Sequence, residues 1–173
     1  KDQSIITLNQ IHSNKVIVFE KKNSIKNKLS ADAIVTTIKN IPLGILTADC
    51  VPILFYDPNK KVMGCAHSGW RGALNGIVKN TIKKFNKLNC KNDELIVAVG
   101  PCIKKENYEV GIELYDKFVK QDQSHEECFK KVKINKYIGN RITKKDALSP
   151  TIVGRGGGTG GPVIIPHPNK KRR

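Results

Sequence analysis

Short apolar runs separated by turn residues dominate the first part of the chain and constrain what it can fold into. Four such runs lie at 33–37, 42–47, 51–56 and 62–66. The segment Asp57-Pro-Asn-Lys60 between the last two is typical of a hairpin turn. Residues 5–19 alternate between apolar and polar around His12 and indicate a strand, a tight turn and a second strand. This part of the chain therefore predicts a β-sheet.

The apolar spacing changes after Gly72. From 73 to 88 the apolar residues recur at intervals of three and four with lysines outside, which predicts one amphipathic helix. The run at 95–99 predicts another buried strand, and 112–119 predicts a further helix. The predicted elements begin with a series of strands and continue with alternating strands and helices. This order favours an α/β (α+β) layered sandwich with a mixed β-sheet.

The periodicity ends after about residue 139. The segment from Gly154 to Gly161 is rich in glycine, and it is followed by Pro-rich sequence and Lys170-Lys-Arg-Arg173. No GK[ST] follows the glycines, so they do not form a P-loop. A chain of 173 residues suffices for one domain with a real core. We therefore predict a single domain over 1–139 and a disordered, basic Gly/Pro-rich tail over 140–173.

The net charge of +16 favours a nucleic-acid partner, but its distribution argues against one. Nine of the 31 basic residues fall in 136–173, and only five are arginines, the usual readers of bases and phosphates. We expect no specific nucleic-acid partner. The sequence contains no run of about 18 apolar residues, the length that a membrane-spanning helix needs, so we also expect no membrane partner. The sequence leaves the oligomeric state open.

The start of the chain bears on its location and completeness. The first residue is Lys1 and the only methionine is Met63, which leads us to expect that the sequence begins inside a longer product. No signal-peptide pattern is present at the start as given. A cytoplasmic location is the default expectation.

Two histidines and one cysteine form the strongest candidate site. Cys50 and His67 each stand at the end of an apolar run, and His12 has a similar place after an earlier one. Two imidazoles and a thiolate make a three-ligand metal set, which leaves one tetrahedral position open for water or substrate and is typical of a catalytic metal site. Taken singly, each residue also has an ordinary structural interpretation. Cys50 could be a thiol of the core, His67 could be a buried or capping histidine, and His12 could be a loop histidine.

The remaining candidates are less specific. Asp49 is either a turn residue or a general acid or base near the metal. Arg71, at the start of the predicted helix, is either a surface guanidinium or a phosphate ligand. His125 and Cys128 also have a metal-compatible spacing, although a solvated helix face explains them as well. The five cysteines are an odd number without a CxxC pair, so we expect buried thiols rather than disulfides.

Several motifs resemble those of one family. They are Gln10-Ile-His12, Ala31-Asp-Ala33, Thr47-Ala-Asp-Cys50-Val-Pro52, Ala66-His-Ser-Gly-Trp-Arg-Gly72 and Gly100-Pro-Cys-Ile103. In this order and spacing, from about residue 5 to 138, the chain resembles the YfiH-like family, also called laccase-domain or multicopper polyphenol oxidases and, more recently, purine nucleoside phosphorylases.

The resemblance carries implications for fold, metal and reaction. It implies a YfiH-like fold, one zinc ion held by His12, Cys50 and His67, and a role for Arg71 with phosphate and for Asp49 in catalysis. It also implies a cytoplasmic enzyme that takes a small nucleoside and phosphate as partners. Such an enzyme cleaves adenosine, inosine and methylthioadenosine to the free base and ribose 1-phosphate, and has adenosine deaminase activity.

Three other functions stay open at this point. A polyphenol oxidase would use copper, which a Cys/His/His set can bind, but multicopper chemistry needs more than the four histidines present. A hydrolase that edits peptidoglycan precursors would use Cys50 as nucleophile with His67. A zinc-stabilised module without activity would be favoured by a fourth protein ligand, and an open position at the metal would count against it. The chain also lacks the family's N-terminal strand region and its usual C-terminal segments, so the substrate pocket is expected to be incomplete.

Overall fold

The computed structural model describes residues 5–20, 29–132 and 147–150. The contacts divide them into two compact units, the first reaching to Cys102 and the second beginning at Ile103. Most of the predicted tail over 140–173 lies outside the described residues, and the single domain over 1–139 stays a prediction. Among the helices of the described ranges, none has the length and apolar composition to cross a membrane.

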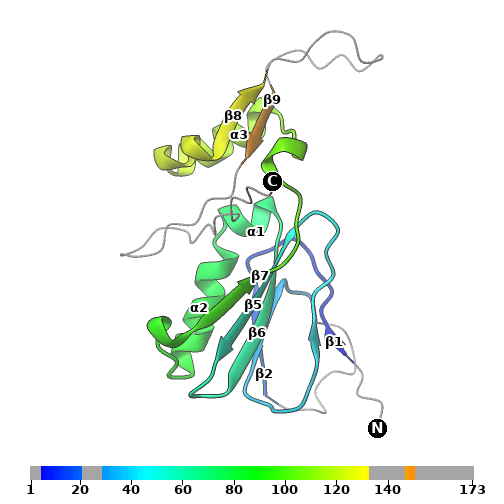
Figure 1. The fold of residues 1–173 in the computed structure, drawn as a ribbon, viewed down its shortest axis with the longest axis vertical. Coiled ribbons are helices and arrows are strands. Elements are labelled where there is room, and N and C mark those ends of the chain that lie inside the picture. Colours follow the sequence, from blue (N-terminus) through cyan, green and yellow to red (C-terminus); the bar gives the residue numbers. More distant parts are fainter. Residues whose placement is uncertain (1–4, 21–28, 133–146, 151–173) are drawn as a thin grey trace, which may run out of the picture. The chain divides into compact units, whose positions relative to one another are not determined.

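The first unit is built on a mixed five-stranded sheet, as the sequence predicts (Figure 1). Its strand order is β2 (Val16–Phe19), β3 (Ala33–Thr36), β6 (Val62–Ser68), β5 (Val51–Asp57) and β7 (Ile96–Val99). β2 and β3 are parallel, and the other neighbours are antiparallel. The predicted hairpin at Asp57 is confirmed, because its carboxylate Oδ1 accepts hydrogen bonds from the amides of Asn59 and Lys60 and closes the turn between β5 and β6.

The strands on either side of His12 do not pair with each other. β1 (Ile6–Thr7) pairs in parallel with β4 (Leu43–Gly44), and β2 pairs with β3. The intervening backbone instead bonds to a third segment, since the Asn9 amide donates to the Leu29 carbonyl and the Ala31 amide donates to the Asn9 carbonyl. A hairpin centred on His12 is therefore replaced by two strands in separate sheets.

The single helix predicted over 73–88 is two helices. α1 (Trp70–Leu74) and α2 (Ile77–Lys87) are separated by Asn75 and Gly76. Gly76 has φ of +76°, a left-handed conformation that glycine adopts without a steric penalty. The apolar spacing continues across this break, so periodicity alone does not reveal it.

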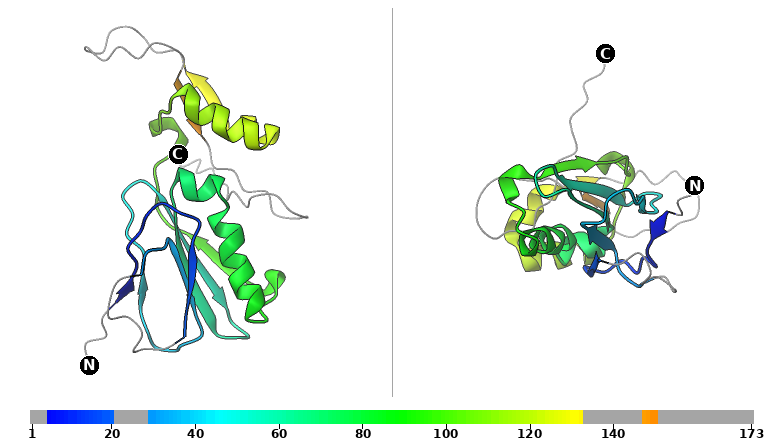
Figure 2. Two further views of the ribbon diagram at one scale, coloured as in Figure 1. Left: turned by 180° about the vertical axis from the view of Figure 1, so that it is seen from behind. Right: turned by 90° about the horizontal axis from the view of Figure 1, so that it is seen from below.

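Helix α2 covers one face of the sheet. Figure 2 shows it lying along the strands, and it contacts β2, β3 and β6. Its Phe85 is fully buried, and the ring centroid lies 5.8 Å from that of Phe55. Gly64 on β6 makes this approach possible, because a Cβ there would lie 3.1 Å from the Phe85 ring and 2.8 Å from the Ile34 carbonyl oxygen.

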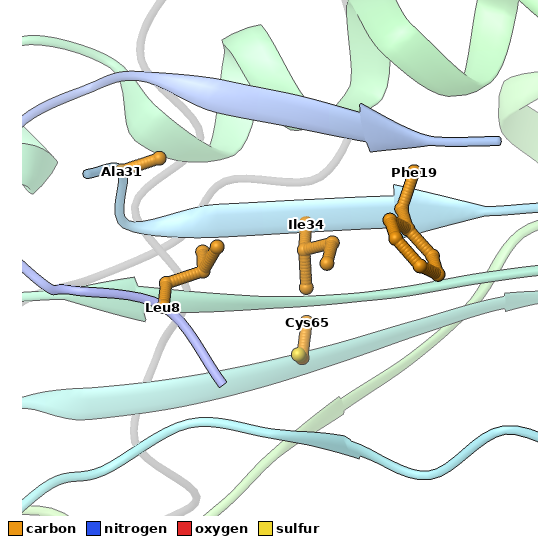
Figure 3. Close-up of a cluster of buried hydrophobic side chains, with 5 residues drawn as sticks. All are labelled: Leu8, Phe19, Ala31, Ile34 and Cys65. Carbon is orange, nitrogen blue, oxygen red and sulfur yellow. The ribbon is translucent and has the colours of Figure 1, made fainter. Parts of the chain in front are cut away.

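A cluster of buried apolar side chains covers part of the opposite face (Figure 3). Its members come from four separate segments and are Leu8, Phe19, Ala31, Ile34 and Cys65. Ile6 of β1 and Leu43 of β4 pack against this cluster. The sheet thus lies between α2 on one side and the β1–β4 pair on the other, which is the layered α/β arrangement expected from the sequence.

Strand β7 is not buried, contrary to the prediction. It pairs with β5 at the end of the strand order, and all four of its residues are exposed. Ile96 is 59% exposed and Val97 is 42% exposed. The reason is its edge position, since the contacts of α2 are with β2, β3 and β6.

The second unit holds the predicted C-terminal helix, α3 (Ile112–Gln121), and the antiparallel pair β8 (Phe129–Val132) and β9 (Ala147–Pro150). Phe118 is its buried centre, with ring centroids 5.6 Å from Phe129 and 5.7 Å from His125. Three short 3-10 helices complete the described elements, η1 (Asn92–Glu94) in the first unit and η2 (Lys105–Asn107) and η3 (Gln123–Cys128) in the second.

Replacing Phe85 by alanine tests the contact between α2 and the sheet. We expect Phe85→Ala to lower the free energy of unfolding by about 3–5 kcal/mol, because it leaves a cavity opposite Gly64. The measurement is urea unfolding followed by the fluorescence of Trp70, the single tryptophan. Lys87→Ala, at an exposed position of the same helix, is the control and should change little. Equal stability of the two variants would contradict the packing described here.

Candidate metal centre

The three side chains proposed from sequence lie together in the first unit. His12 lies in the connection between β1 and β2, Cys50 directly precedes β5, and His67 is on β6. Their potential ligand atoms all lie within 4.8 Å of one another. The β5–β6 hairpin brings two of them together, because Val51 is opposite Ser68 and Pro52 is opposite His67 in the register.

A side chain to which sequence reasoning gave no role, Asp32, contacts two of these segments. Its carboxylate is fully buried just before β3, and Oδ1 lies 2.8 Å from His67 Nδ1. The same carboxylate accepts hydrogen bonds from the backbone amides of residues 11–13. A signal was present in the sequence, since Asp32 interrupts an apolar segment, and aspartate is almost never fully buried unless it is paired.

The pKa of Asp32 lies below its usual value. Burial raises the pKa of this carboxyl, but hydrogen bonds from His67, Ser13 and the His12 amide outweigh burial and stabilise the charged form. Asp32 is therefore a carboxylate at neutral pH.

His12 is more exposed than His67, and its backbone is unusual. Its φ is +56°, in the left-handed region that non-glycine residues seldom adopt. The ring stands edge-on to that of His67, with centroids 4.7 Å apart and an interplanar angle of 84°. This arrangement brings two imidazoles from distant parts of the sequence to one point.

The Cys50 side chain is half-buried beside the two histidines. Burial raises the pKa of its thiol, and the negative charges of Asp49 and Asp32 raise it further. The free side chain is therefore a neutral thiol at neutral pH, and a metal that binds it as a thiolate displaces a proton.

Gly69 leaves the space between Cys50 and His12 open. A Cβ at this position would lie 3.0 Å from Cys50 Sγ and 3.0 Å from His12 Cδ2. These distances are shorter than most real Cβ contacts, so a side chain here would push the Cys50 and His12 side chains aside by a few tenths of an ångström. Glycine at this position avoids that displacement.

Gln10 joins the segment before Cys50 to the His12 loop. Its side-chain Nε2 donates to the Leu46 carbonyl at 2.7 Å, and the Leu46 amide donates to its Oε1 at 2.8 Å. The motif residue Gln10 thus has a structural role in holding two segments of the site together.

The other predicted site residues are less closely tied to the centre. Asp49 is exposed and adjoins Cys50 in the chain, and its charge acts on the thiol. Arg71 is exposed on α1, with its guanidinium carbon 4.7 Å from the centroid of the Trp70 ring. This is a cation–π contact. Neither residue is in the three-ligand group.

The alternative ligands His125 and Cys128 lie in the second unit and are buried there. His125 Nδ1 lies 2.9 Å from the Phe118 carbonyl oxygen, which ties this histidine to the core around α3. All five cysteines are free. Within the described ranges, the group of His12, Cys50 and His67 contains three ligands and not four.

This donor set fits a catalytic metal ion. Two imidazole nitrogens and one thiolate suit zinc, and they also suit copper. Three protein ligands leave room for a water or substrate, whereas a structural zinc site is normally closed by a fourth. In the described residues, these three side chains could therefore hold a metal ion and leave a position open.

Replacing Cys50 tests the ligand set directly. We expect Cys50→Ala to lose the bound metal, from about one ion per chain to a trace, because two imidazoles alone hold a divalent ion weakly. Elemental analysis of the purified protein measures this. Cys102→Ala removes another half-buried thiol outside the group and should keep its metal. Full metal content in Cys50→Ala would show that the thiolate is not a ligand.

A methyl group at Gly69 tests the geometry more finely. Gly69→Ala should weaken metal affinity on the order of tenfold, the size of effect that displaced ligands and their supports produce, while the fold stays intact. Competition with a chromophoric chelator measures the affinity. Gly111→Ala is the matched control, since its added methyl would meet only the end of the exposed Glu113 side chain. Unchanged affinity in Gly69→Ala would contradict the close approach described here.

Comparison with known proteins agrees with the motifs. Residues 1–144 match the family described as multi-copper polyphenol oxidoreductase laccase. A purine nucleoside phosphorylase of Rickettsia conorii is 37% identical over 139 residues, which is 80% of this chain and 56% of that protein. A protein named adenosine deaminase, from an unknown prokaryotic organism, is 36% identical over 89 residues, or 51% of this chain and 34% of that protein.

The fold is also shared with solved structures. A crystal structure of a Neisseria meningitidis protein of family DUF152 matches with a TM-score of 0.67 and 28% identity, covering 86% of this chain and 55% of that one. This chain thus spans about half the length of the relatives it matches. Together with the His12, Cys50 and His67 cluster, these matches show that the chain belongs to the laccase-domain family, the YfiH-like family that its motifs resemble.

Proposed function

We propose that this chain carries the metal centre of a zinc-dependent purine nucleoside phosphorylase. The reaction is cleavage of adenosine, inosine and methylthioadenosine by phosphate to the free base and ribose 1-phosphate, with adenosine deaminase activity at the same site. The observation that carries the proposal is the open set of His12, Cys50 and His67, in a chain similar to proteins named for these two reactions.

The residues present fit a zinc ion. His12, Cys50 and His67 would hold it, and when bound it supplies an acidified water and a Lewis acid. The buried Asp32 carboxylate keeps His67 in a fixed orientation through its bond to Nδ1. Gly69 keeps the space beside Cys50 and His12 free of side-chain atoms. The chain thus provides both the ligands and open space next to them.

Two exposed apolar side chains on the segments that carry His12 and precede Cys50 would offer contacts to a nucleobase. Ile11, next to His12, is 50% exposed, and Leu46 is 66% exposed. The two hydrogen bonds between Gln10 and Leu46 keep these two side chains on adjoining segments. Apolar side chains with a few placed polar groups are the usual lining of a site for a flat ring such as a purine.

Two charged residues would serve the two halves of the reaction. Arg71 would orient the phosphate that attacks C1′ of the ribosyl group, since a guanidinium matches phosphate oxygens in a fork. Asp49, beside Cys50, would relay a proton from water to the nitrogen of the departing base, which leaves with the bonding electrons. Both side chains are exposed and so are free to meet a substrate.

Copper oxidation of phenols is the second candidate, and the description of the matching family favours it. A single Cys/His/His set can bind copper. Oxidation of a phenol with reduction of oxygen by a multicopper enzyme needs several copper ions, and the described ranges contain one group of three potential ligands. The geometry therefore supports the phosphorylase better.

Metal content and turnover decide between these functions. We expect about one zinc ion per chain and release of adenine from adenosine only when phosphate is present, with ammonia as the product of the deaminase reaction. Chromatography of the products measures both, and Cys50→Ala is the inactive control. Arg71→Ala should raise the KM for phosphate.

Three outcomes would overturn the proposal. Zinc without turnover of any purine nucleoside would do so, and so would phenol oxidation that depends on copper. Absence of any bound metal would mean that the three side chains are not a metal site.

A further inference from the structure

One buried carboxylate is hydrogen-bonded to the segments that carry two of the three candidate ligands. The Asp32 side chain is 0% exposed and accepts five hydrogen bonds. Oδ1 accepts from His67 Nδ1 at 2.8 Å and from the His12 amide at 2.9 Å. Oδ2 accepts from the Ser13 amide at 2.6 Å, the Ser13 hydroxyl at 2.7 Å and the Ile11 amide at 3.3 Å.

The bond to His67 determines which ring nitrogen can face a metal. An ionised carboxylate only accepts hydrogen bonds, so Nδ1 of the neutral imidazole must carry the proton. Nε2 then holds the free lone pair. This is the tautomer that a metal ligand bound through Nε2 needs.

The bonds to residues 11–13 determine where the second imidazole lies. Three consecutive amides point at one carboxylate, and the residue in the middle is His12, whose φ is +56°. A left-handed conformation at a non-glycine residue costs free energy, and surrounding contacts must maintain it. Here those contacts are the hydrogen bonds to Asp32.

The backbone fixes Asp32 itself. Its amide donates to the Lys15 carbonyl at 3.1 Å, and its carbonyl accepts from the His67 amide at 2.7 Å. The second of these bonds continues the β3–β6 ladder by one residue beyond the Ala33–Ala66 pair. These two bonds therefore fix the backbone that carries the carboxylate, between the His12 loop and the end of β6.

From this geometry we propose that Asp32 is the positioning residue of the metal centre. A single carboxylate sets the tautomer of His67 and the backbone conformation of His12, so that both imidazoles are ready to bind before a metal arrives. The proposal rests on the metal centre proposed above and is independent of which substrate that centre acts on.

The first test needs no variant. In the metal-free chain with ¹⁵N-labelled histidine, NMR should show His67 protonated on Nδ1. His67→Gln assigns the signal among the four histidines. A neutral His67 ring that carries its proton on Nε2 and none on Nδ1 in the wild-type chain would overturn the proposal, whether or not any variant folds.

The second test uses Asp32→Asn. An amide group has one acceptor oxygen and must turn its NH₂ toward donors, so the bond to His67 and the bonds to residues 11–13 cannot all remain. We expect affinity for Zn²⁺ to fall about 10- to 100-fold, as removal of such supporting partners typically causes. The visible spectrum of bound Co²⁺ should change as well. Both are measured without a nucleoside, so they do not depend on turnover.

A neighbouring threonine provides the matched control. Thr36 is also buried on β3, and its hydroxyl donates to the Phe19 carbonyl at 2.6 Å, away from the three ligands. Thr36→Val should lower stability and leave Zn²⁺ affinity and the Co²⁺ spectrum unchanged. Ser13→Ala removes one bond to Asp32 and should weaken Zn²⁺ binding less than Asp32→Asn. Wild-type affinity in Asp32→Asn, or an equal loss in Thr36→Val, would show that Asp32 has only a structural role.

Discussion

A charged group buried in a protein interior has to be compensated there, and in this chain the compensation of Asp32 organises the surrounding structure. Its carboxylate is removed from water and is stabilised by donors from the 11–13 loop and from β6. These donors come from segments that lie far apart in the sequence. Satisfying one buried charge therefore fixes three segments relative to each other, and two of them supply imidazoles.

The sheet provides the rest of the arrangement. The β5–β6 hairpin is closed by the Asp57 turn at one end, and its register places Cys50 and His67 near each other at the other end. Helix α2 packs on one face of the sheet, and the apolar cluster around Ile34 packs on the other. The candidate centre thus lies where the β5–β6 hairpin meets a loop of unusual backbone conformation. The hairpin sets the distance between two of the candidate ligands, Cys50 and His67, and the loop supplies the third, His12.

Residue type and position in the chain were sufficient to predict the layers, the β5–β6 hairpin, helix α3 and the three side chains that lie together. The pairing of the strands on either side of His12 was predicted wrongly, and three further features could not be predicted in this way. The break at Gly76 is invisible to apolar periodicity because the spacing continues across it. The exposure of β7 follows from its place at the sheet edge, which depends on strand order rather than on composition. The role of Asp32 depends on contacts across more than 30 positions in the sequence, of which the interrupted apolar run gives only a hint.

The edge position of β7 has a consequence for the physical behaviour of the chain. Among the described residues, the uncharged Ile-Val-Ala-Val strand stands at the end of the sheet with exposed side chains, and such an edge is a template for strand addition between molecules. The net charge of +16 opposes such addition through mutual repulsion. Salt screens that repulsion and leaves the apolar edge unchanged. The colloidal stability of this chain therefore depends on two opposing interactions, strand addition at β7 and repulsion between positively charged molecules. Raising the ionic strength weakens the repulsion and favours assembly.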